Sequence, residues 1–375
     1  MRFTNCTIYD EQFSPVRRDL VVRDGKIVDL PRPDQPSAEH LEGGGSVDLG
    51  GRCVIPGLID IHIHGAVAAD TMDADFAGLD RISHYLARHG VTGFLPTTMT
   101  VAVEDIEAAF RQSTAVGGAE VLGFNMEGPF INVDRKGAHV AEHVRPPTLE
   151  EFDRYRPERG IRVLTIAPEV PGALDFIEAV SDRVVCSIGH STADYDTALA
   201  AIDRGARSLT HTFNAMPPLL HRDPGLIAAA VRRGIHAEII ADTIHVHPAM
   251  IYCAWKLFGP ERLTLISDSM RAGGLVDGEY ELGGQAIFVR GGVARTADGT
   301  IGGGTSTVWA GFRNAVAAGI PFAEALRMAS LTPAELIGVQ DRKGSLAVGR
   351  DADFVVLDGR DKIHSVYIAG RLHAG

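Results

Sequence analysis

The sequence predicts an α/β protein: a (β/α)8 barrel with a small β-sandwich domain formed by both termini. Three observations support this prediction. In the middle of the chain, strand-like segments alternate with helix-patterned segments, which implies parallel strands. At both ends, short β-type runs are separated by glycine turns. Histidine and acidic residues stand where several middle segments end, and barrels carry their chemistry at the carboxyl ends of their strands.

The two ends of the chain predict one β domain. Runs rich in strand-forming residues are broken by Asp-Gly and Gly-Gly turns. Chain ends of a domain often lie close together. We therefore expect residues 1–54 and 340–375 to form a single small domain. The runs cover residues 3–10, 20–30, 43–55, 344–359 and 363–375.

Residues 55–339 predict the barrel. Eight strand-like segments occur here, mostly followed by helical patterns such as 73–90. The alternative is an open doubly wound sheet, which usually has a glycine-rich fingerprint after its first strand. Here the first segment ends in His-Ile-His-Gly, which favours the barrel. The stretch 277–304 looks like a β-hairpin insertion. The eight segments are 58–65, 92–98, 120–128, 161–169, 183–190, 207–211, 236–242 and 262–268.

Composition excludes several classes of protein. The 375 residues carry 36 basic and 48 acidic side chains, a net charge of −12. This balance argues against a nucleic-acid partner and against attraction to an anionic membrane. No apolar run is long enough for a membrane span, and no signal peptide is recognised. The four cysteines form no CxxC pair, so we expect reduced thiols and a cytoplasmic protein.

Histidines and acids at the ends of the predicted strands indicate a metal site. His62 and His64 are two residues apart on a strand and so share a face. Each such residue alone has an ordinary structural explanation, such as a hydrogen-bonded histidine or a helix cap. Together they converge on one rim of the barrel, which favours metal binding. The others are Glu127 after the third segment, His190 after the fifth, His211 after the sixth and Asp268 after the eighth.

The ligand types indicate the metal. Imidazole and carboxylate without thiolate suit a divalent transition ion, with zinc preferred and iron the alternative. Glu127, His190 and His211 leave a fourth position open, as catalytic zinc sites do. His62 and His64 could hold a second ion, with Glu127 bridging, so one or two ions are expected. No lysine ends a strand here, so a carbamylated lysine bridge is not expected.

The order of short motifs resembles one family. HxH after IPGLIDIH, then EGPF, KGAH, GHS, THTFNAM, HRDPG, DTIHV and SDS follow one another along the chain. This order resembles the N-acetylglucosamine-6-phosphate deacetylases of the amidohydrolase superfamily, over nearly the whole chain. The resemblance implies hydrolysis of the acetamide of N-acetylglucosamine 6-phosphate to glucosamine 6-phosphate and acetate, in amino-sugar catabolism or cell-wall recycling. A metal-activated hydroxide would attack the carbonyl, with Asp268 as general acid and base.

The resemblance also implies substrate contacts. His139 in KGAH matches the residue that polarises the acetamide carbonyl. Asn214 and Ala215 match the segment that contacts the sugar phosphate, and Arg222 and His245 match phosphate-binding positions. The family is typically a homodimer in which the arginine reaches the neighbouring site. The loop 131–138 could alter substrate choice.

Other functions remain alternatives. A related barrel hydrolase could act on a cyclic amide, as dihydroorotases and allantoinases do, but the missing lysine disfavours it. A deaminase of the same barrel is another alternative, but it usually takes its catalytic glutamate from a helix, whereas Glu127 ends a predicted strand. A non-catalytic assembly protein would be expected to lose ligands, which are all present here. The 6-phosphates of N-acetylgalactosamine or N-acetylmannosamine are alternative substrates.

Overall fold

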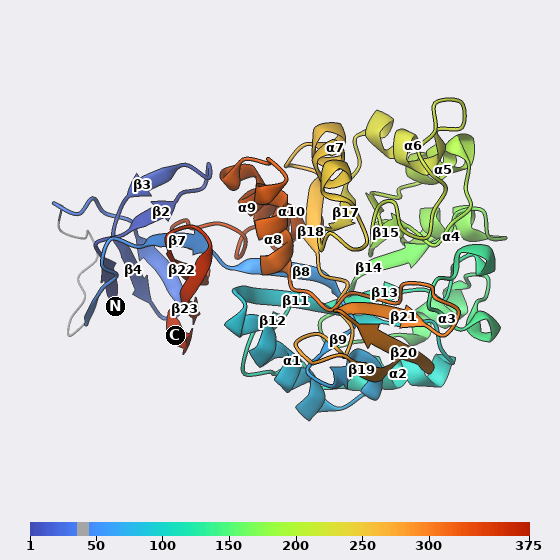
Figure 1. Cartoon of the computed structure of the whole chain (residues 1–375), viewed down its shortest axis with the longest axis horizontal. Helices are drawn as coiled ribbons and strands as arrows, with labels where there is room; N and C mark the ends of the chain where they lie inside the picture. The colour runs from blue at the N-terminus through green and yellow to red at the C-terminus, as the bar shows by residue number, and fades with distance from the viewer. Residues whose placement is uncertain (36–44) are drawn as a thin grey trace.

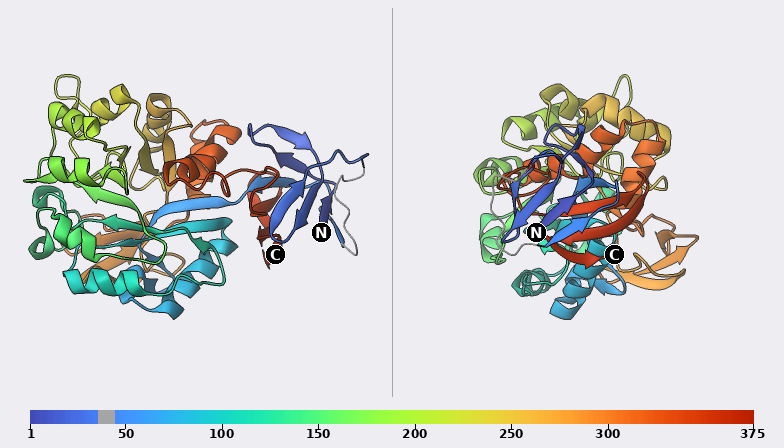
Figure 2. Two further views of the ribbon diagram at one scale, coloured as in Figure 1. Left: turned by 180° about the vertical axis from the view of Figure 1, so that it is seen from behind. Right: turned by 90° about the vertical axis from the view of Figure 1, so that its left-hand side faces the viewer.

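The computed structural model describes residues 1–35 and 45–375. Residues 43 and 44 of the expected strand run 43–55 therefore lie outside the described residues. The molecule is elongated, with a small β domain at one end and a larger α/β body at the other (Figure 1). Seen along the long axis, the small domain lies in front of the larger body (Figure 2, right).

The larger body is a barrel of parallel strands. Six of its strands pair in parallel in the order β8-β11-β13-β14-β15-β16, and β17 pairs in parallel with β18. In the part of the chain that the structure describes, the eight barrel strands are β8 (Leu58–Ile63), β11 (Val91–Thr98), β13 (Phe124–Glu127), β14 (Ile161–Ile166), β15 (Val185–Ile188), β16 (Ser208–Leu209), β17 (Ala237–Ile240) and β18 (Leu263–Ile266). A short strand, β12 (Glu120–Val121), precedes β13 beside β11.

Backbone hydrogen bonds close the barrel at its two remaining gaps. Between β16 and β17, the Thr212 amide donates to the Glu238 carbonyl at 2.8 Å. Between β18 and β8, the Asp268 amide donates to the His62 carbonyl at 2.9 Å, and the His64 amide to the Ser269 carbonyl at 2.8 Å. The predicted barrel class is confirmed, and several of the closing bonds involve residues of the expected site.

Helices cover the outside of the barrel. In α1 (Phe76–Arg88), the Asp75 carboxylate accepts hydrogen bonds from the first helical amides, and the buried Leu79, Ile82 and Leu86 recur at helical spacing. None of the described helices is long and apolar enough to cross a membrane. The others are α2 (Val103–Arg111), α3 (Leu149–Arg154), α4 (Ala173–Val180), α5 (Tyr195–Asp203), α6 (Gly225–Arg233), α7 (Pro248–Phe258), α8 (Val308–Ala317), α9 (Phe322–Ala329) and α10 (Leu331–Leu336).

Strands from both ends of the chain share a sheet in the small domain. The six-stranded sheet has the order β24-β23-β22-β7-β2-β3, so the C-terminal β22 lies beside the N-terminal β7. The second sheet has the order β5-β4-β1-β6. The strands are β1 (Arg2–Thr4), β2 (Thr7–Tyr9), β3 (Pro15–Arg17), β4 (Leu20–Arg23), β5 (Lys26–Asp29), β6 (Ser46–Asp48), β7 (Cys53–Pro56), β22 (Phe354–Asp358), β23 (Lys362–Ile368) and β24 (Arg371–Ala374).

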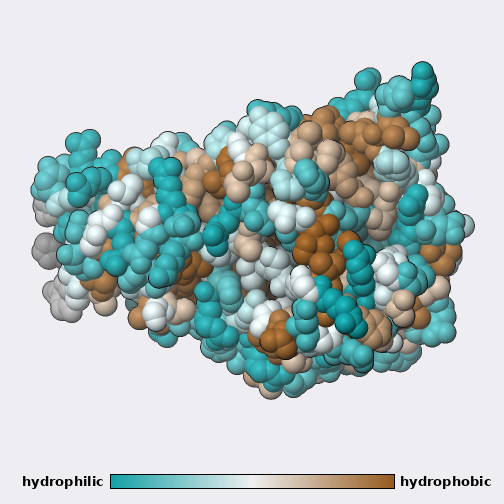
Figure 3. Space-filling view, viewed as in Figure 1, coloured by the Kyte–Doolittle hydropathy of each residue, from teal (hydrophilic) through white to brown (hydrophobic). Residues whose placement is uncertain are grey.

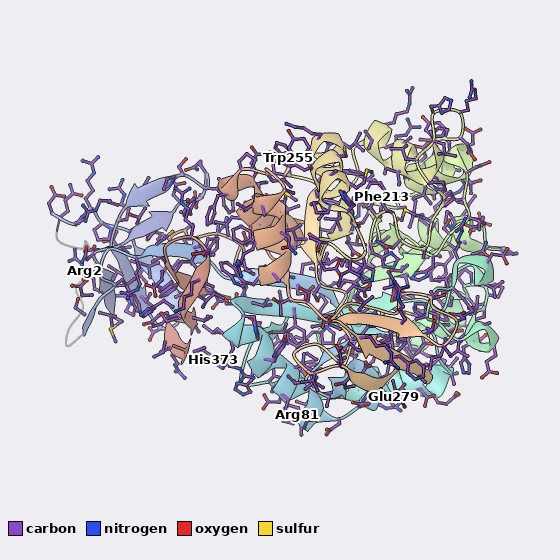
Figure 4. The ribbon with its side chains drawn as sticks, viewed as in Figure 1. Arg2, Arg81, Phe213, Trp255, Glu279 and His373 are labelled. Atoms are coloured by element: carbon purple, nitrogen blue, oxygen red, sulfur yellow. The ribbon has the colours of Figure 1, made fainter. Side chains whose placement is uncertain are left out.

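An antiparallel insertion follows β18. It has three described strands, β19 (Gly278–Leu282), β20 (Gln285–Arg290) and β21 (Val293–Thr296), so the expected hairpin was one strand short. Gly291 and Gly292, both with positive φ, form the second turn. Figure 4 shows Arg2 of the small domain and Glu279 of the insertion far apart along the long axis.

A buried charge cluster joins the small domain to the start of the barrel. The Lys343 ammonium contacts the Asp353 carboxylate, Glu120 Oε2 at 2.7 Å and Asp351 Oδ2 at 3.2 Å. Its side chain is only 3% exposed. Glu120 belongs to β12 beside the barrel, whereas the two aspartates precede β22. Glu120 and Asp351 also contact Arg342, so removing the lysine would leave the buried Asp353 carboxylate without its cation.

We predict that Lys343→Met lowers the free energy of unfolding by about 3–5 kcal/mol, the usual cost of breaking a buried ion pair by removing one partner. Urea unfolding would measure the change. Lys362→Met, at an exposed lysine of β23, serves as control and should change stability by less than about 0.5 kcal/mol. Equal effects of the two substitutions would contradict a structural role for the cluster.

Candidate active site

Four histidine side chains converge on one carboxylate at the carboxyl ends of the barrel strands. Glu127 Oε1 lies 2.9 Å from His211 Nε2 and 3.0 Å from His190 Nε2. It lies 3.5 Å from His62 Nε2, and Glu127 Oε2 lies 3.1 Å from His64 Nε2. All five side chains are buried. They form two overlapping triads that share Glu127, each with metal-ligand spacing.

Hydrogen bonds on the far side of the rings fix the tautomers. His62 Nδ1 faces Glu238 Oε2 at 3.0 Å. His64 Nδ1 faces the Thr97 carbonyl at 3.3 Å, and His190 Nδ1 faces the Arg135 carbonyl at 2.8 Å. Since these oxygens only accept, each Nδ1 donates its proton, and the neutral ring presents an Nε2 lone pair to the cluster.

A cation fits this donor set. His190 Nε2 and His211 Nε2 lie 3.0 Å apart beside the Glu127 carboxylate. The buried His62 Nε2 has no hydrogen-bond partner among the described residues. Lone pairs and carboxylate oxygens repel one another at these distances unless positive charge lies between them. The residues therefore fit a divalent metal site of imidazole and carboxylate ligands.

The pKa values show the same demand for positive charge. Burial lowers the pKa of His64, but hydrogen bonds to Asp268 and Glu127 outweigh it and raise this pKa to about 9. Burial likewise opposes the charge of His62, yet Glu127 and Glu238 raise its pKa well above the ordinary value. Metal binding displaces such protons, so metal and protons compete here.

His139 has the opposite tautomer. Its Nδ1 accepts a hydrogen bond from the Thr100 amide at 3.1 Å, so the proton of the neutral ring is on Nε2. That Nε2 lies 3.4 Å from Glu127 Oε2. Burial lowers the pKa of His139 to about 4, despite the opposing effect of Glu127. The ring is therefore neutral near pH 7 and presents an N–H donor, not a lone pair, to the site.

Asp268 faces the His62–His64 side of the cluster. Its Oδ1 lies 3.3 Å from His64 Nε2 and 3.6 Å from His62 Nε2. Burial raises its pKa, but the hydrogen bond from His64 and the charges of both imidazoles lower it to about 2. The carboxylate is thus ionised and able to accept a proton.

The backbone is strained where the strands end. His190, His211 and Asp268 have φ values of 47°, 27° and 48°. Such left-handed conformations cost non-glycine residues of order 1–3 kcal/mol each and gather at functional sites. Here they turn the side chains into the barrel mouth directly after β15, β16 and β18.

A cavity of about 500 Å³ lies above the cluster. Of the predicted substrate contacts, Asn214, Ala215, His139 and His245 line it, whereas Arg222 does not. Arg222 is exposed, and its guanidinium lies against the His221 ring. Lys136 of the loop 131–138 also lines the cavity, as do Leu282, Thr300 and Ile301 of the insertion stretch.

Asp242 favours the charged form of His245, which lines the cavity. Its Nδ1 lies 2.7 Å from Asp242 Oδ2, and the Asp242 carboxylate also accepts the His245 amide at 2.8 Å. Burial opposes the charged form, but Asp242 raises the pKa of His245 above its ordinary value. An imidazolium here is suited to an anionic group.

Sequence reasoning missed three supporting carboxylates. Glu238 contacts His62, and Asp242 contacts His245. The buried Asp60 accepts a hydrogen bond from the Ser267 hydroxyl at 2.5 Å. This bond links β8 to the segment that carries Asp268. A charged residue inside an apolar strand segment, as in HAEIIAD and LIDIHIHG, was the available signal, because buried charges need partners.

Comparisons with known proteins agree with this geometry. The model of the amidohydrolase family matches residues 53–372. N-acetylglucosamine-6-phosphate deacetylase of Bacillus subtilis (strain 168) is 39% identical over 351 residues, 90% of this chain and 87% of the relative. N-acetylgalactosamine-6-phosphate deacetylase of Escherichia coli O157:H7 is 39% identical over 330 residues, 84% of this chain and 86% of the relative.

A solved structure is similar over the full length. A mutant of N-acetyl-D-glucosamine-6-phosphate deacetylase from Mycobacterium smegmatis, in complex with N-acetyl-D-glucosamine-6-phosphate, superimposes with a TM-score of 0.91 and 34% identity. The match covers 100% of this chain and 99% of that chain. The chain therefore belongs to the amidohydrolase family and, within it, to the N-acetylglucosamine-6-phosphate deacetylases.

Proposed function

We propose that the protein hydrolyses the acetamide of N-acetylglucosamine 6-phosphate to glucosamine 6-phosphate and acetate, using a divalent metal. The observation that carries this proposal is the division of tautomers in one buried cluster. Histidines with Nε2 lone pairs surround Glu127, whereas His139 presents an N–H at the same place. A metal-assisted acyl transfer needs both a ligand set and a donor for the developing oxyanion.

Asp268 transfers the proton, and His139 stabilises the negative charge that develops on the carbonyl oxygen. The metal, when bound, supplies a Lewis acid that polarises a carbonyl and acidifies water. The ionised Asp268 carboxylate accepts the proton of the attacking water. His139 Nε2–H donates to the carbonyl oxygen as negative charge develops there. Asp268 then gives the proton to the leaving nitrogen, so the amine departs neutral.

We assign the phosphate end of the substrate to the outer part of the cavity. Asp242 favours the charged form of His245, and Lys136 offers a second cation in the lining of the same cavity. Asn214 and Ala215, in the segment after β16, line the same cavity. N-acetylgalactosamine 6-phosphate is a second candidate substrate, because the Escherichia coli O157:H7 relative that is named for it is 39% identical to this chain, as the Bacillus subtilis relative is.

We propose zinc as the metal, with two ions per chain. Glu127, His190 and His211 would hold one, and His62 and His64 would hold the other together with Glu127. The neutral imidazoles and carboxylate suit zinc, with iron as the alternative.

We further propose a cytoplasmic homodimer in which Arg222 reaches the neighbouring site. Figure 3 shows apolar side chains gathered along the upper edge of that view, over α6 and α7. Four apolar side chains are each more than a third exposed here: Leu219 and Leu220 just before Arg222, Ile244 between β17 and α7, and Met250 on α7. A second copy would cover such a surface. All four cysteines are free, as in a reducing compartment.

Asp268→Asn should lower kcat by about 10²–10⁴, because the amide cannot take the proton of water. KM should change little. Steady-state acetate release from N-acetylglucosamine 6-phosphate measures both constants. Asp298→Asn, at a cavity-lining acid outside the cluster, is the control and should retain wild-type kcat. A kcat for Asp268→Asn within threefold of wild type would exclude the acid–base role.

His245→Gln should raise KM for the phosphorylated sugar about tenfold or more, since a hydrogen bond to a charged group is worth about 1.5–3 kcal/mol. Because Asp242 raises the pKa of His245, the charge is present below that pKa and lost above it. Wild-type KM should therefore rise at alkaline pH, and the variant's should not. His247→Asn, which keeps a capping side chain for α7, is the control. A KM with the same pH dependence in both proteins would refute the phosphate role.

Removing metal with a chelator should lower Tm, and adding zinc should restore it, because the ligand set exists only in the folded state. At free zinc about 100-fold above Kd, the gain is about 2.7 kcal/mol per site. Differential scanning calorimetry measures the shift. His190→Ala should reduce the gain, whereas His364→Ala, in β23 of the small domain, should not. An unchanged Tm on zinc addition to the stripped protein would argue against the site.

A further inference from the structure

Glu238 lies directly behind the metal cluster. It belongs to β17 and is 0% exposed. Its Oε2 accepts from His62 Nδ1 at 3.0 Å and from the His211 amide at 3.2 Å. One carboxylate oxygen therefore contacts a residue from each of the two triads, His62 in one and His211 in the other.

Its burial is not explained by packing or by a complete set of hydrogen bonds. Glu238 Oε1 is buried without a partner among the described residues. A buried carboxylate with an unpartnered oxygen destabilises a fold, and such groups in native proteins point to a functional role.

Glu238 differs from the partners of the other ligands. The Nδ1 atoms of His64 and His190 donate to backbone carbonyls, whereas that of His62 donates to a carboxylate. A carboxylate partner orients the ring more strongly and makes it a more basic ligand. Glu127 and Asp268 lie on the Nε2 side of His62, so they do not compete for this role.

We propose that Glu238 is a positioning residue that fixes the Nδ1–H tautomer of His62 and thereby sets the affinity of the ion held by His62 and His64. This inference rests on the proposed two-ion site. Because the same Oε2 also accepts the His211 amide, rotation of the carboxylate away from His62 would break a second hydrogen bond, which keeps the acceptor in place.

The test measures zinc affinity by competition with a chromophoric chelator, with no sugar present. Glu238→Met keeps the length of the side chain but removes the acceptor. It should weaken one of the two zinc ions 10–100-fold, the usual effect of losing a partner behind a metal-bound histidine. Glu238→Gln should weaken it less, since the amide oxygen can accept from both His62 Nδ1 and the His211 amide. Thr264→Val, at the position paired with Glu238 on β18, is the control and should bind zinc as wild type does.

A double variant decides whether Glu238 acts through His62. In the His62→Ala background, Glu238→Met should cause no further loss of zinc affinity. Additive losses, equal losses in the Met and Gln variants, or a His62→Ala isotherm identical to wild type would each overturn the inference. If Glu238→Met does not fold, Glu238→Asp replaces it, because the shorter carboxylate keeps the charge but no longer reaches His62. A failed deacetylase assay would leave these zinc results unchanged, so the two proposals fail separately.

Discussion

The carboxylate of Glu127 is the point on which the site depends. It is buried, and five imidazole Nε2 atoms lie within 3.5 Å of its oxygens. Such a concentration of lone pairs in a region of low dielectric is stable only with positive charge inside it. In the protein alone, protons supply that charge, as the raised pKa values of His62 and His64 show. The same electrostatic demand makes the cluster a metal site.

Hydrogen bonds from outside the cluster decide what each ring does. Acceptors at Nδ1 turn His62, His64 and His190 into lone-pair donors, whereas one backbone amide at Nδ1 turns His139 into an N–H donor. Chemically identical side chains thus acquire opposite roles a few ångströms apart. The difference lies in the surroundings of the ring and not in the residue type.

Stability and chemistry occupy opposite ends of the barrel. At the start of the strands, Lys343 and its carboxylates tie the small domain to the barrel. At the strand ends, left-handed backbone at His190, His211 and Asp268 costs stability but directs the side chains inward. Gln285 of the insertion donates to the Ala138 carbonyl at 2.6 Å, so the insertion and the loop 131–138 form the cavity wall together.

The sequence by itself determined the barrel, because the alternation of strand and helix patterns leaves few topologies. It also determined which residues stand at strand ends, and parallel strands in one barrel bring those ends to one rim. The sequence did not determine the tautomers, since these depend on backbone groups of Thr97, Thr100 and Arg135, which lie 33, 39 and 55 residues from the histidines that they contact. It also gave no reason to connect Glu238 with His62, 176 residues away. Only the pairing of β17 with β18, together with closure of the barrel between β18 and β8, brings that carboxylate behind the imidazole, because hydrogen-bond partners are set by three-dimensional proximity and not by local pattern.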